Sequence, residues 1–305
     1  MKDRIDPQAA LATEIRRIVA DQLTMASADL ASARTEPERG FHETRKRLKG
    51  LRALYRLVRP ADPAFWRAEN IRLRDVARDL AGAREAAALV ETVDRLAKAY
   101  PKQVSDGGID PIRAALVRRH DRIVEDRSGL DGLIDDATQA LDEGRHAVGA
   151  SALPDDPLTA ADVLAEGAAS AMKRASRALE DARKHGREND FHELRKAVKD
   201  HWTHLALLAS FWPKSVKSRR KKVDSLGEEL GELNDLFVLQ ALIDKQDDSL
   251  GVNGDVDLLS RLVKRSQKKL RKRCLAKAER LFDLRPAKVE RKLVDRYREE
   301  ASAER

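Results

Sequence analysis

The chain has 305 residues, of which 42% are hydrophobic, 37% are charged and 4% are aromatic. This length and composition fit one large domain or two small ones, with a core built mainly from Leu, Ala and Val. The 60 Lys and Arg residues outnumber the 52 Asp and Glu residues, which predicts an acidic partner: nucleic acid, anionic lipid, polyphosphate or an acidic protein. The single cysteine, Cys274, excludes an intrachain disulfide, and no apolar run is long enough to span a membrane. Because the N-terminus lacks a signal-peptide pattern, we expect a cytoplasmic protein without a membrane partner.

The first half of the chain shows helical periodicity. Asp-Pro pairs, which place a capping residue before the first helical position, predict helix starts at residues 6–7, 62–63 and 110–111. A polar break at 35–40 separates the first helix from the second, and Gly82 is expected to loosen or end the third. Residues 112–148 are predicted to form one or two helices, divided near Gly129 or Gly132.

The second half repeats this organisation after a boundary at 149–157, which contains two prolines. Thr159 to Asp162 is a candidate capping box for the next helix. A polar break at 185–190 follows, and a linker at 247–255 precedes two final helices with a basic run from Lys264 to Lys277. Alternating strand patterns are absent, and good helix formers dominate, so the predicted fold class is all-α.

A nine-residue phrase occurs twice, at 41–49 and at 191–199, with an offset of 150 residues. Both copies read Phe-His-Glu-x-Arg-Lys-x-x-Lys, and on a helix the cationic positions fall on one stripe with an apolar face behind it. The stripe contains His42, Arg45, Lys46, Lys49, Arg52 and Arg56 in the first copy, and His192, Arg195, Lys196 and Lys199 in the second. Like charges three and four residues apart repel one another. The duplication therefore suggests that an anionic ligand relieves this repulsion.

Further positions repeat at the same offset. Residues 80–85 match residues 230–235, and Arg72 matches Lys222. Because they share the spacing of the repeated phrase, Arg72 and Lys222 are added as second-tier candidate ligands.

The shared offset also predicts the architecture. We expect two tandem antiparallel helical bundles, residues 1–150 and 151–305, related by a pseudo-twofold axis around a basic central channel. This symmetry would bring His42 and His192 to equivalent places, with the cationic faces lining a common surface. Whether the basic run near the C-terminus also lines the channel is left open.

The two His-x-x-Arg-x-x-x-Lys copies at 42–49 and 192–199, together with Leu-Gly-Glu-Leu-Asn-Asp at 230–235, resemble the CHAD family, the conserved histidine α-helical domain. The resemblance covers nearly the whole chain. It implies two helical halves around a basic channel that binds inorganic polyphosphate, with no catalysis of its own and with targeting to polyphosphate granules. The ligand-facing residues of the family carry over to His42, Arg45, Lys46, Lys49, Arg52, His192, Arg195, Lys196 and Lys199.

Enzyme motifs are absent from the sequence, which has no P-loop, no dinucleotide-binding glycine motif, no nucleophile elbow and no Cys-x-x-Cys pair. The repeated phrase also lacks the second histidine of a zinc-binding helix. We therefore expect no catalytic residue, no metal and no cofactor. Two alternatives stay open: a basic helical nucleic-acid-binding protein, which the scarcity of aromatics disfavours, and an enzyme acting on phosphate polymers, which the lack of a carboxylate cluster for Mg²⁺ disfavours.

Three smaller expectations concern the surroundings of the stripe. Glu43 and Glu193 each lie three residues before a lysine, so we expect them to pair with Lys46 and Lys196. His201 falls on the apolar side of its helix, so we expect it in the core and not at a phosphate.

Overall fold

The computed structural model describes residues 3–126, 128–212, 216–247, 250, 255–283 and 285–303, apart from the side chains of Ala83 and Arg84. Within these ranges the chain forms eleven helices and no strand, which confirms the all-α prediction. In chain order they are α1 (Leu11–Ser32), α2 (Pro37–Val58), α3 (Pro63–Asp79), α4 (Gly82–Ala99), α5 (Asp110–Glu125), α6 (Leu130–Gly149), α7 (Pro157–Lys184), α8 (Glu188–Leu207), α9 (Val216–Asp244), α10 (Val256–Phe282) and α11 (Pro286–Ala301).

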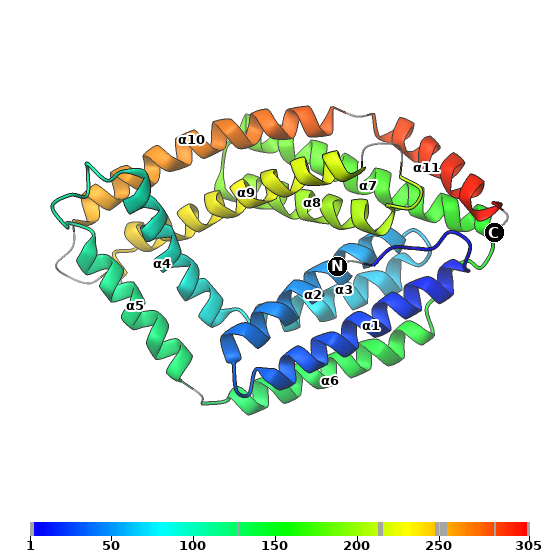
Figure 1. Ribbon diagram of the computed structural model, residues 1–305, viewed down its shortest axis with the longest axis horizontal. Coiled ribbons are helices and arrows are strands. Elements are labelled where there is room, and N and C mark those ends of the chain that lie inside the picture. The colour runs from blue at the N-terminus through cyan, green and yellow to red at the C-terminus, as the bar shows by residue number, and fades with distance from the viewer. Residues whose placement is uncertain are drawn as a thin grey trace.

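The helices form two groups that lie along the long axis of the molecule (Figure 1). In one group α2 packs on α1 and α3, and α6 packs on the same two helices. In the other group α8 packs between α7 and α9, and α10 packs on α9 and α7. The pair α4–α5 forms an arm at one end and reaches α9 and α10 through α4, while α11 lies along α7 at the other end. The two groups are joined by α2, which contacts both α7 and α8.

Two clusters of buried apolar side chains hold these helices together. The first joins α1, α2, α3, α6 and α11 to the N-terminal part of α7, through residues such as Leu164 and Met172. The second joins α4, α5, α8, α9 and α10 to the C-terminal part of α7, through residues such as Ala175 and Leu179. Each cluster therefore draws helices from both sides of residue 150, and α7 contributes to both. The division of the chain at residue 150 stays a prediction.

Aspartates cap three of the described helices: Asp62 at α3, Asp156 at α7 and Asp255 at α10. Asp62 caps α3, and its carboxylate accepts a hydrogen bond from the backbone N–H of Phe65 over 3.1 Å. At the start of α7 the capping residue is Asp156, which accepts from the N–H of Thr159 over 2.8 Å. The capping box predicted to begin at Thr159 is therefore wrong, because Thr159 already lies inside the helix.

The remaining predicted boundaries in the first half have mixed outcomes. The predicted start at 6–7 is wrong, because the Asp6 side chain bonds the nearby N–H of Gln8 and α1 begins only at Leu11. The division of 112–148 is confirmed at Gly129, whose φ of +74° lies in the left-handed region that favours glycine. The helix that follows Pro63 ends before Gly82, as predicted.

The helix bounds also repeat at the offset of 150. Subtracting 150 from the bounds of α8 gives 38–57, which nearly coincides with α2. The same subtraction places α9 at 66–94, where the first half holds α3 and α4. The two halves differ here, because α9 runs unbroken through residues that correspond to the break at Leu80 and Ala81.

A close backbone approach fixes α7 against α2. A Cβ atom placed on Gly167 of α7 would overlap the carbonyl oxygen of Leu57 in α2. Both residues are buried, so neither helix can move aside without disturbing the first apolar cluster. Only glycine permits this spacing between the two helices.

We predict that Gly167→Ala destabilises the fold by about 1–3 kcal/mol or more, because the added methyl group overpacks a buried helix crossing. The matched control is Gly132→Ala on α6, where a Cβ atom would meet no atom within 4 Å. That substitution is expected to be neutral or to stabilise by about 0.5–1 kcal/mol. Urea unfolding followed by circular dichroism measures both changes; equal stability of the two variants would contradict the proposed crossing.

Candidate functional site

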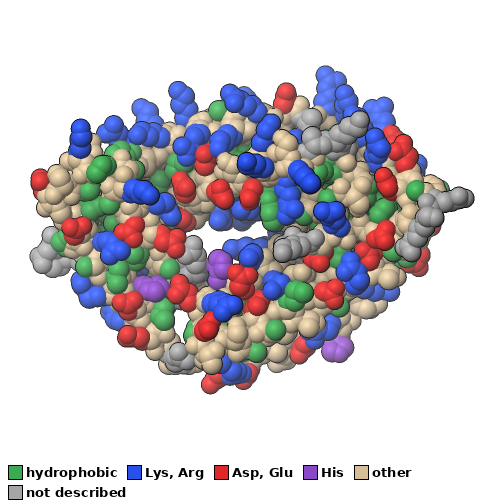
Figure 2. Space-filling model, viewed as in Figure 1, with side chains coloured by type: hydrophobic (Ala, Val, Ile, Leu, Met, Phe, Trp, Pro, Cys, Tyr) green, Lys and Arg blue, Asp and Glu red, His purple; other side chains and the backbone are tan. Residues whose placement is uncertain are grey.

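The molecule is hollowed between its two groups of helices (Figure 2). Figure 2 shows both Lys or Arg and Asp or Glu side chains around this hollow. The helices α2 and α8 carry the two copies of the repeated phrase and pack on one another where the groups meet. This packing brings parts of the two cationic stripes to one place in the fold.

At this place Lys49 of α2 lies among cations of both copies. Its ammonium group is repelled by Arg45 and Arg52 of its own helix and by Arg195 and Lys199 of α8. Burial among protein atoms is the largest cause, and this repulsion the next, of a Lys49 pKa lowered to about 8. The side chain is nevertheless in contact with solvent. We call these five residues the inner cation cluster.

The cations on α8 lie over two glycines of α9. A Cβ atom on Gly227 would lie 3.1 Å from Lys199 Nζ, and one on Gly231 would lie 3.5 Å from Arg195 Nη2. Burial lowers the pKa of both cations. The Nε of Arg195 is buried and has no hydrogen-bond partner among the described residues. On α8, Arg195 is thus half-buried with unused hydrogen-bonding capacity, whereas Lys199 is 45% exposed.

Three carboxylates of α9 partly offset this charge: Asp224 and Glu228 act on Lys199, and Asp235 acts on Arg195. Asp224 Oδ1 lies 3.8 Å from Lys199 Nζ, and Asp235 raises the pKa of Arg195. Asp235 also accepts a hydrogen bond from Arg95 of α4 over 3.1 Å, so its charge is shared. Burial outweighs these carboxylates, since the pKa of each α8 cation is lowered.

Arg45 is held at the end of a helix. Its Nη1 donates to the carbonyl oxygens of Ala81, over 3.0 Å, and Leu80, over 3.4 Å. These carbonyls follow the last turn of α3, where a cation is favoured by the unsatisfied acceptors and the helix dipole. Arg45 therefore has a structural role besides any role in binding.

The far end of the α2 stripe is neutralised by a nearly buried carboxylate, Asp200. One oxygen of Asp200 accepts from Arg56 over 3.0 Å, and the other accepts from Arg174 of α7. Arg52 lies beside this group and donates to Asn70 Oδ1 over 3.2 Å. Burial, followed by repulsion from Arg56, lowers the pKa of Arg52 to about 10. Arg56 thus serves chiefly to pair Asp200, whereas Arg52 belongs to the cluster.

Two histidines of α8, His201 and His204, are buried. His204 Nε2 donates to the carbonyl oxygen of Ala53 in α2 over 2.8 Å, and burial lowers its pKa to about 4. His201 accepts from Arg219 Nε over 3.1 Å, and burial lowers its pKa well below the usual value. Both rings are therefore neutral near pH 7, and the expected core position of His201 is confirmed.

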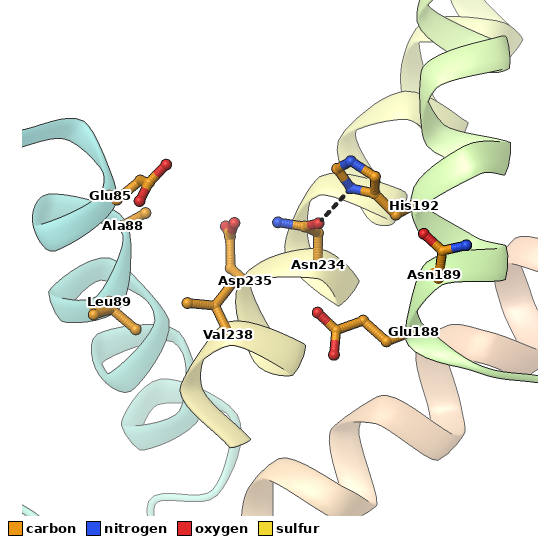
Figure 3. A pocket seen from close by; sticks show the side chains of 9 residues that line it. All are labelled: Glu85, Ala88, Leu89, Glu188, Asn189, His192, Asn234, Asp235 and Val238. Carbon is orange, nitrogen blue, oxygen red and sulfur yellow. Dashed lines mark hydrogen bonds between the residues drawn. The ribbon is translucent and has the colours of Figure 1, made fainter. Parts of the chain in front are cut away.

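His192 lies in a cavity of about 510 Å³ between α4, α8 and α9. Figure 3 shows its Nδ1 directed at Asn234 Oδ1, over a distance of 3.0 Å. Carboxylates of three helices line the same cavity: Glu85, Glu188 and Asp235. The surroundings of this ring are therefore acidic, although Asp235 links the cavity to Arg195 of the cluster.

His42 lies elsewhere on α2. Its side chain is 49% exposed, and its Nε2 is 4.0 Å from Glu43 Oε1. It lines a shallow cavity with residues of the α1–α2 turn and Val124 of α5. The two histidines thus line separate cavities, and the expectation that they share a ligand surface stays a prediction.

The other predicted ligands are dispersed. Lys46 pairs with Glu43 over 3.1 Å and Lys196 with Glu193 over 2.7 Å, which confirms both expected ion pairs. Arg72 pairs with Glu69 within α3 and with Glu143 of α6. Lys222 is exposed on α9. These side chains lie outside the inner cation cluster.

The sequence analysis did not single out Gly227, Asp200 or Arg174. Gly227 had a detectable signal, because it lies four residues before Gly231 and so on the same helix face. Asp200 had none, since spacing along α8 does not tell which cations of α2 and α7 approach its carboxylate. Contacts between distant helices decided its role.

The described residues show neither a cluster of metal ligands nor a helix suited to a membrane. They contain no group of three or more His, Cys, Asp and Glu side chains arranged to hold a metal ion. Among the helices they form, none combines the length and apolar character needed to cross a bilayer.

Comparisons with known proteins agree with this fold. The family model of the CHAD domain matches residues 17–244. No curated protein matches the chain significantly. The crystal structure of the CHAD domain from the plant Ricinus communis aligns with a TM-score of 0.61 over 100% of this chain and 96% of that chain, at 18% identity, a likeness of fold alone. Because the family model spans well over half of its 305 residues, this chain belongs to the CHAD domain family.

Proposed function

We propose that this protein binds inorganic polyphosphate through the inner cation cluster and catalyses no reaction on it. The observation that supports this best is the repulsion of Lys49 by cations from both copies of the phrase. Helices from opposite parts of the chain gather positive side chains, and the carboxylates near the α8 cations oppose them only in part, over a long ion pair or while shared with Arg95. A polyanion would supply the missing negative charge.

The spacing of the cluster suits a linear chain of phosphates. Positions four residues apart on one face of a helix are separated by about 6 Å along its axis. A phosphate polymer carries negative charge at least as densely, so several contacts form at once. The guanidinium groups of Arg52 and Arg195 present paired donors for two phosphate oxygens, and Lys49 and Lys199 act as point charges.

The remaining predicted ligands have unequal support. Lys46, Lys196 and Arg72 are neutralised by neighbouring carboxylates, so we propose them as outer contacts only. His192 adjoins the cluster through Asp235, and we propose it as a donor to a phosphate at the edge of the site. We propose His42 and Lys222 as contacts for a polyphosphate chain long enough to extend beyond the inner cation cluster.

We also propose the larger arrangement that the repeated offset suggests. In it the two halves, 1–150 and 151–305, are related by a pseudo-twofold axis, and the hollow between the helix groups is a basic channel. The near coincidence of α2 with the shifted bounds of α8 supports this. The protein would act in the cytoplasm, at polyphosphate granules.

Removing cluster charges should weaken binding. Lys49→Gln and Lys199→Gln are each expected to lower the affinity for long-chain polyphosphate about tenfold, about 1.4 kcal/mol, because each removes one cation–phosphate contact. Isothermal titration calorimetry at fixed salt measures the change. The matched control is Lys98→Gln, an exposed lysine of α4 that should leave the affinity unaltered.

The same titrations test the class of ligand. Orthophosphate should bind far more weakly than the polymer, and the logarithm of the affinity should fall linearly with the logarithm of salt concentration. Duplex DNA of equal charge that binds as tightly, and loses affinity equally in both cluster variants, would refute the assignment of polyphosphate.

Binding should be linked to a proton on Lys49. In the free protein its pKa is about 8, so the side chain loses its proton as the pH rises through this value. A bound phosphate favours the charged form and raises that pKa. Affinity is therefore expected to fall as the pH rises above 8, with proton uptake on binding.

Titrations just above pH 8 in two buffers of different ionisation enthalpy would reveal this uptake as a buffer-dependent heat. Lys49→Arg is the matched control, because arginine keeps its charge throughout this range and should remove most of the pH dependence. A pH dependence equal in the wild type and this variant would assign the proton to another group.

A further inference from the structure

The positive charge of the chain is concentrated in one segment outside the inner cation cluster. Residues 261–292, which cover most of α10 and the start of α11, contain fourteen Lys and Arg and three Asp and Glu residues. Their net charge is +11, whereas the whole chain carries +8. The rest of the chain is therefore net negative by three, and the predicted attraction to an acidic partner resides mainly in this segment.

Many of these cations face outward. Figure 1 places α10 along an outer edge of the molecule, and Figure 2 shows a row of Lys and Arg side chains along that edge. Some basic residues of α10 are engaged with the protein: Arg273 and Lys277 pair with Glu229, and Arg271 lies over Phe191 and Phe237. The exposed cations of α10 that no described carboxylate pairs are Arg261, Lys264, Arg265, Lys268, Lys269, Lys272 and Arg280. We call these seven residues the outer basic face.

The outer basic face has positive charge but lacks exposed aromatic, amide and large apolar groups among the described residues. Its nearest aromatic ring, Tyr100, is 5% exposed and is covered by Arg265 and Lys269, so it cannot stack on a base. Gln267, the one amide of α10, is buried and bonded to the Leu236 carbonyl. No exposed large apolar side chain lies on α10 among the described residues, so nothing there would insert into a bilayer. The ligand is therefore recognised by charge alone.

The distribution of the charges favours a flexible chain. At about 100° per residue, Lys264 and Lys269 point about 140° apart around α10. A flat surface or a rigid rod touches a convex helix along one line and leaves one of these side chains unmatched. A flexible linear polymer can follow both sides of the helix, and Lys264, Lys268 and Lys272 repeat about every 6 Å along it.

We propose that the outer basic face is a second binding site for a flexible phosphate polymer, separate from the inner cation cluster; the choice of polymer rests on the proposed function. A long chain held at the inner cluster then meets the outer face at high effective concentration. Affinity should therefore rise with chain length beyond the length that fills the inner cluster. Short chains should occupy the two sites independently.

The test uses the triple variant Lys264→Gln, Lys268→Gln, Lys272→Gln, in which glutamine preserves helix propensity. Calorimetry with a polyphosphate shorter than α10 should give two sites in the wild type and one in the variant. With a long chain, the variant should bind more weakly, and its salt slope should fall by about two to three.

The control removes equal charge elsewhere, by Arg113→Gln, Arg118→Gln and Arg122→Gln on the exposed side of α5, and should keep both sites. A third protein, with Lys49→Gln and Lys199→Gln, separates the two proposals. If it alone loses a site, the inner cluster binds and the outer face is refuted. If only the α10 variant loses a site, the outer face stands and the proposed inner site fails.

Two further outcomes overturn the inference. One is a triple variant that keeps two short-chain sites and its long-chain affinity. The other is a variant whose only loss is binding to anionic lipid vesicles or duplex RNA, measured by cosedimentation and by fluorescence anisotropy, because the partner of α10 would then be a membrane or a nucleic acid.

Discussion

The close packing of α2 on α7 and α8 is the constraint on which the rest of the structure depends. Gly167 lets the backbone of α7 touch that of α2, and the buried, neutral ring of His204 bonds the Ala53 carbonyl of α2 from α8. Each repeated helix turns its apolar side to a core, and the packing of α2 on α8 then brings Lys49 near Arg195 and Lys199. Electrostatic repulsion in the inner cation cluster is thus imposed by hydrophobic packing, which stabilises the fold far more than the repulsion destabilises it.

Several contacts limit this repulsion without removing it. Asp200 takes up the charge of Arg56 and Arg174 at one end, and the carbonyls after α3 hold Arg45 at the other. Between these ends Lys49 has neither an ion pair nor a hydrogen bond within the described chain, and its lowered pKa records the cost. Neutralised flanks around an unpaired central lysine are the arrangement on which the proposal of an anionic ligand rests.

The sequence predicted what periodicity and local spacing control. The all-α class, the break before Gly82, the Glu–Lys pairs three residues apart and the core position of His201 all follow from the helix repeat. Contacts between distant helices were beyond its reach. Which helix faces meet decides three features: the pairing of Arg72 with Glu143, the acidic cavity around His192 and the packing of α4 on α9. The sequence of a charged stripe is the same whether the stripe faces another helix, a carboxylate or water. Asp6 shows the same limit. It precedes a proline, as a helix cap often does, but its carboxylate accepts a hydrogen bond from the N–H of Gln8 in a turn before α1.

The two copies of the phrase are equivalent in sequence and unequal in structure. In the first half the helix after the phrase breaks at Leu80, and the freed carbonyls accept hydrogen bonds from Arg45. In the second half α9 is unbroken, so its carbonyls stay within the helix, and Arg195 lies on Gly231 without a bond to a backbone carbonyl of the described chain. An arginine that makes no such bond gains more from a phosphate oxygen than one that must first leave two carbonyls. The α8 side of the inner cation cluster should therefore dominate the binding energy, although the repeat alone would assign the two sides equal shares.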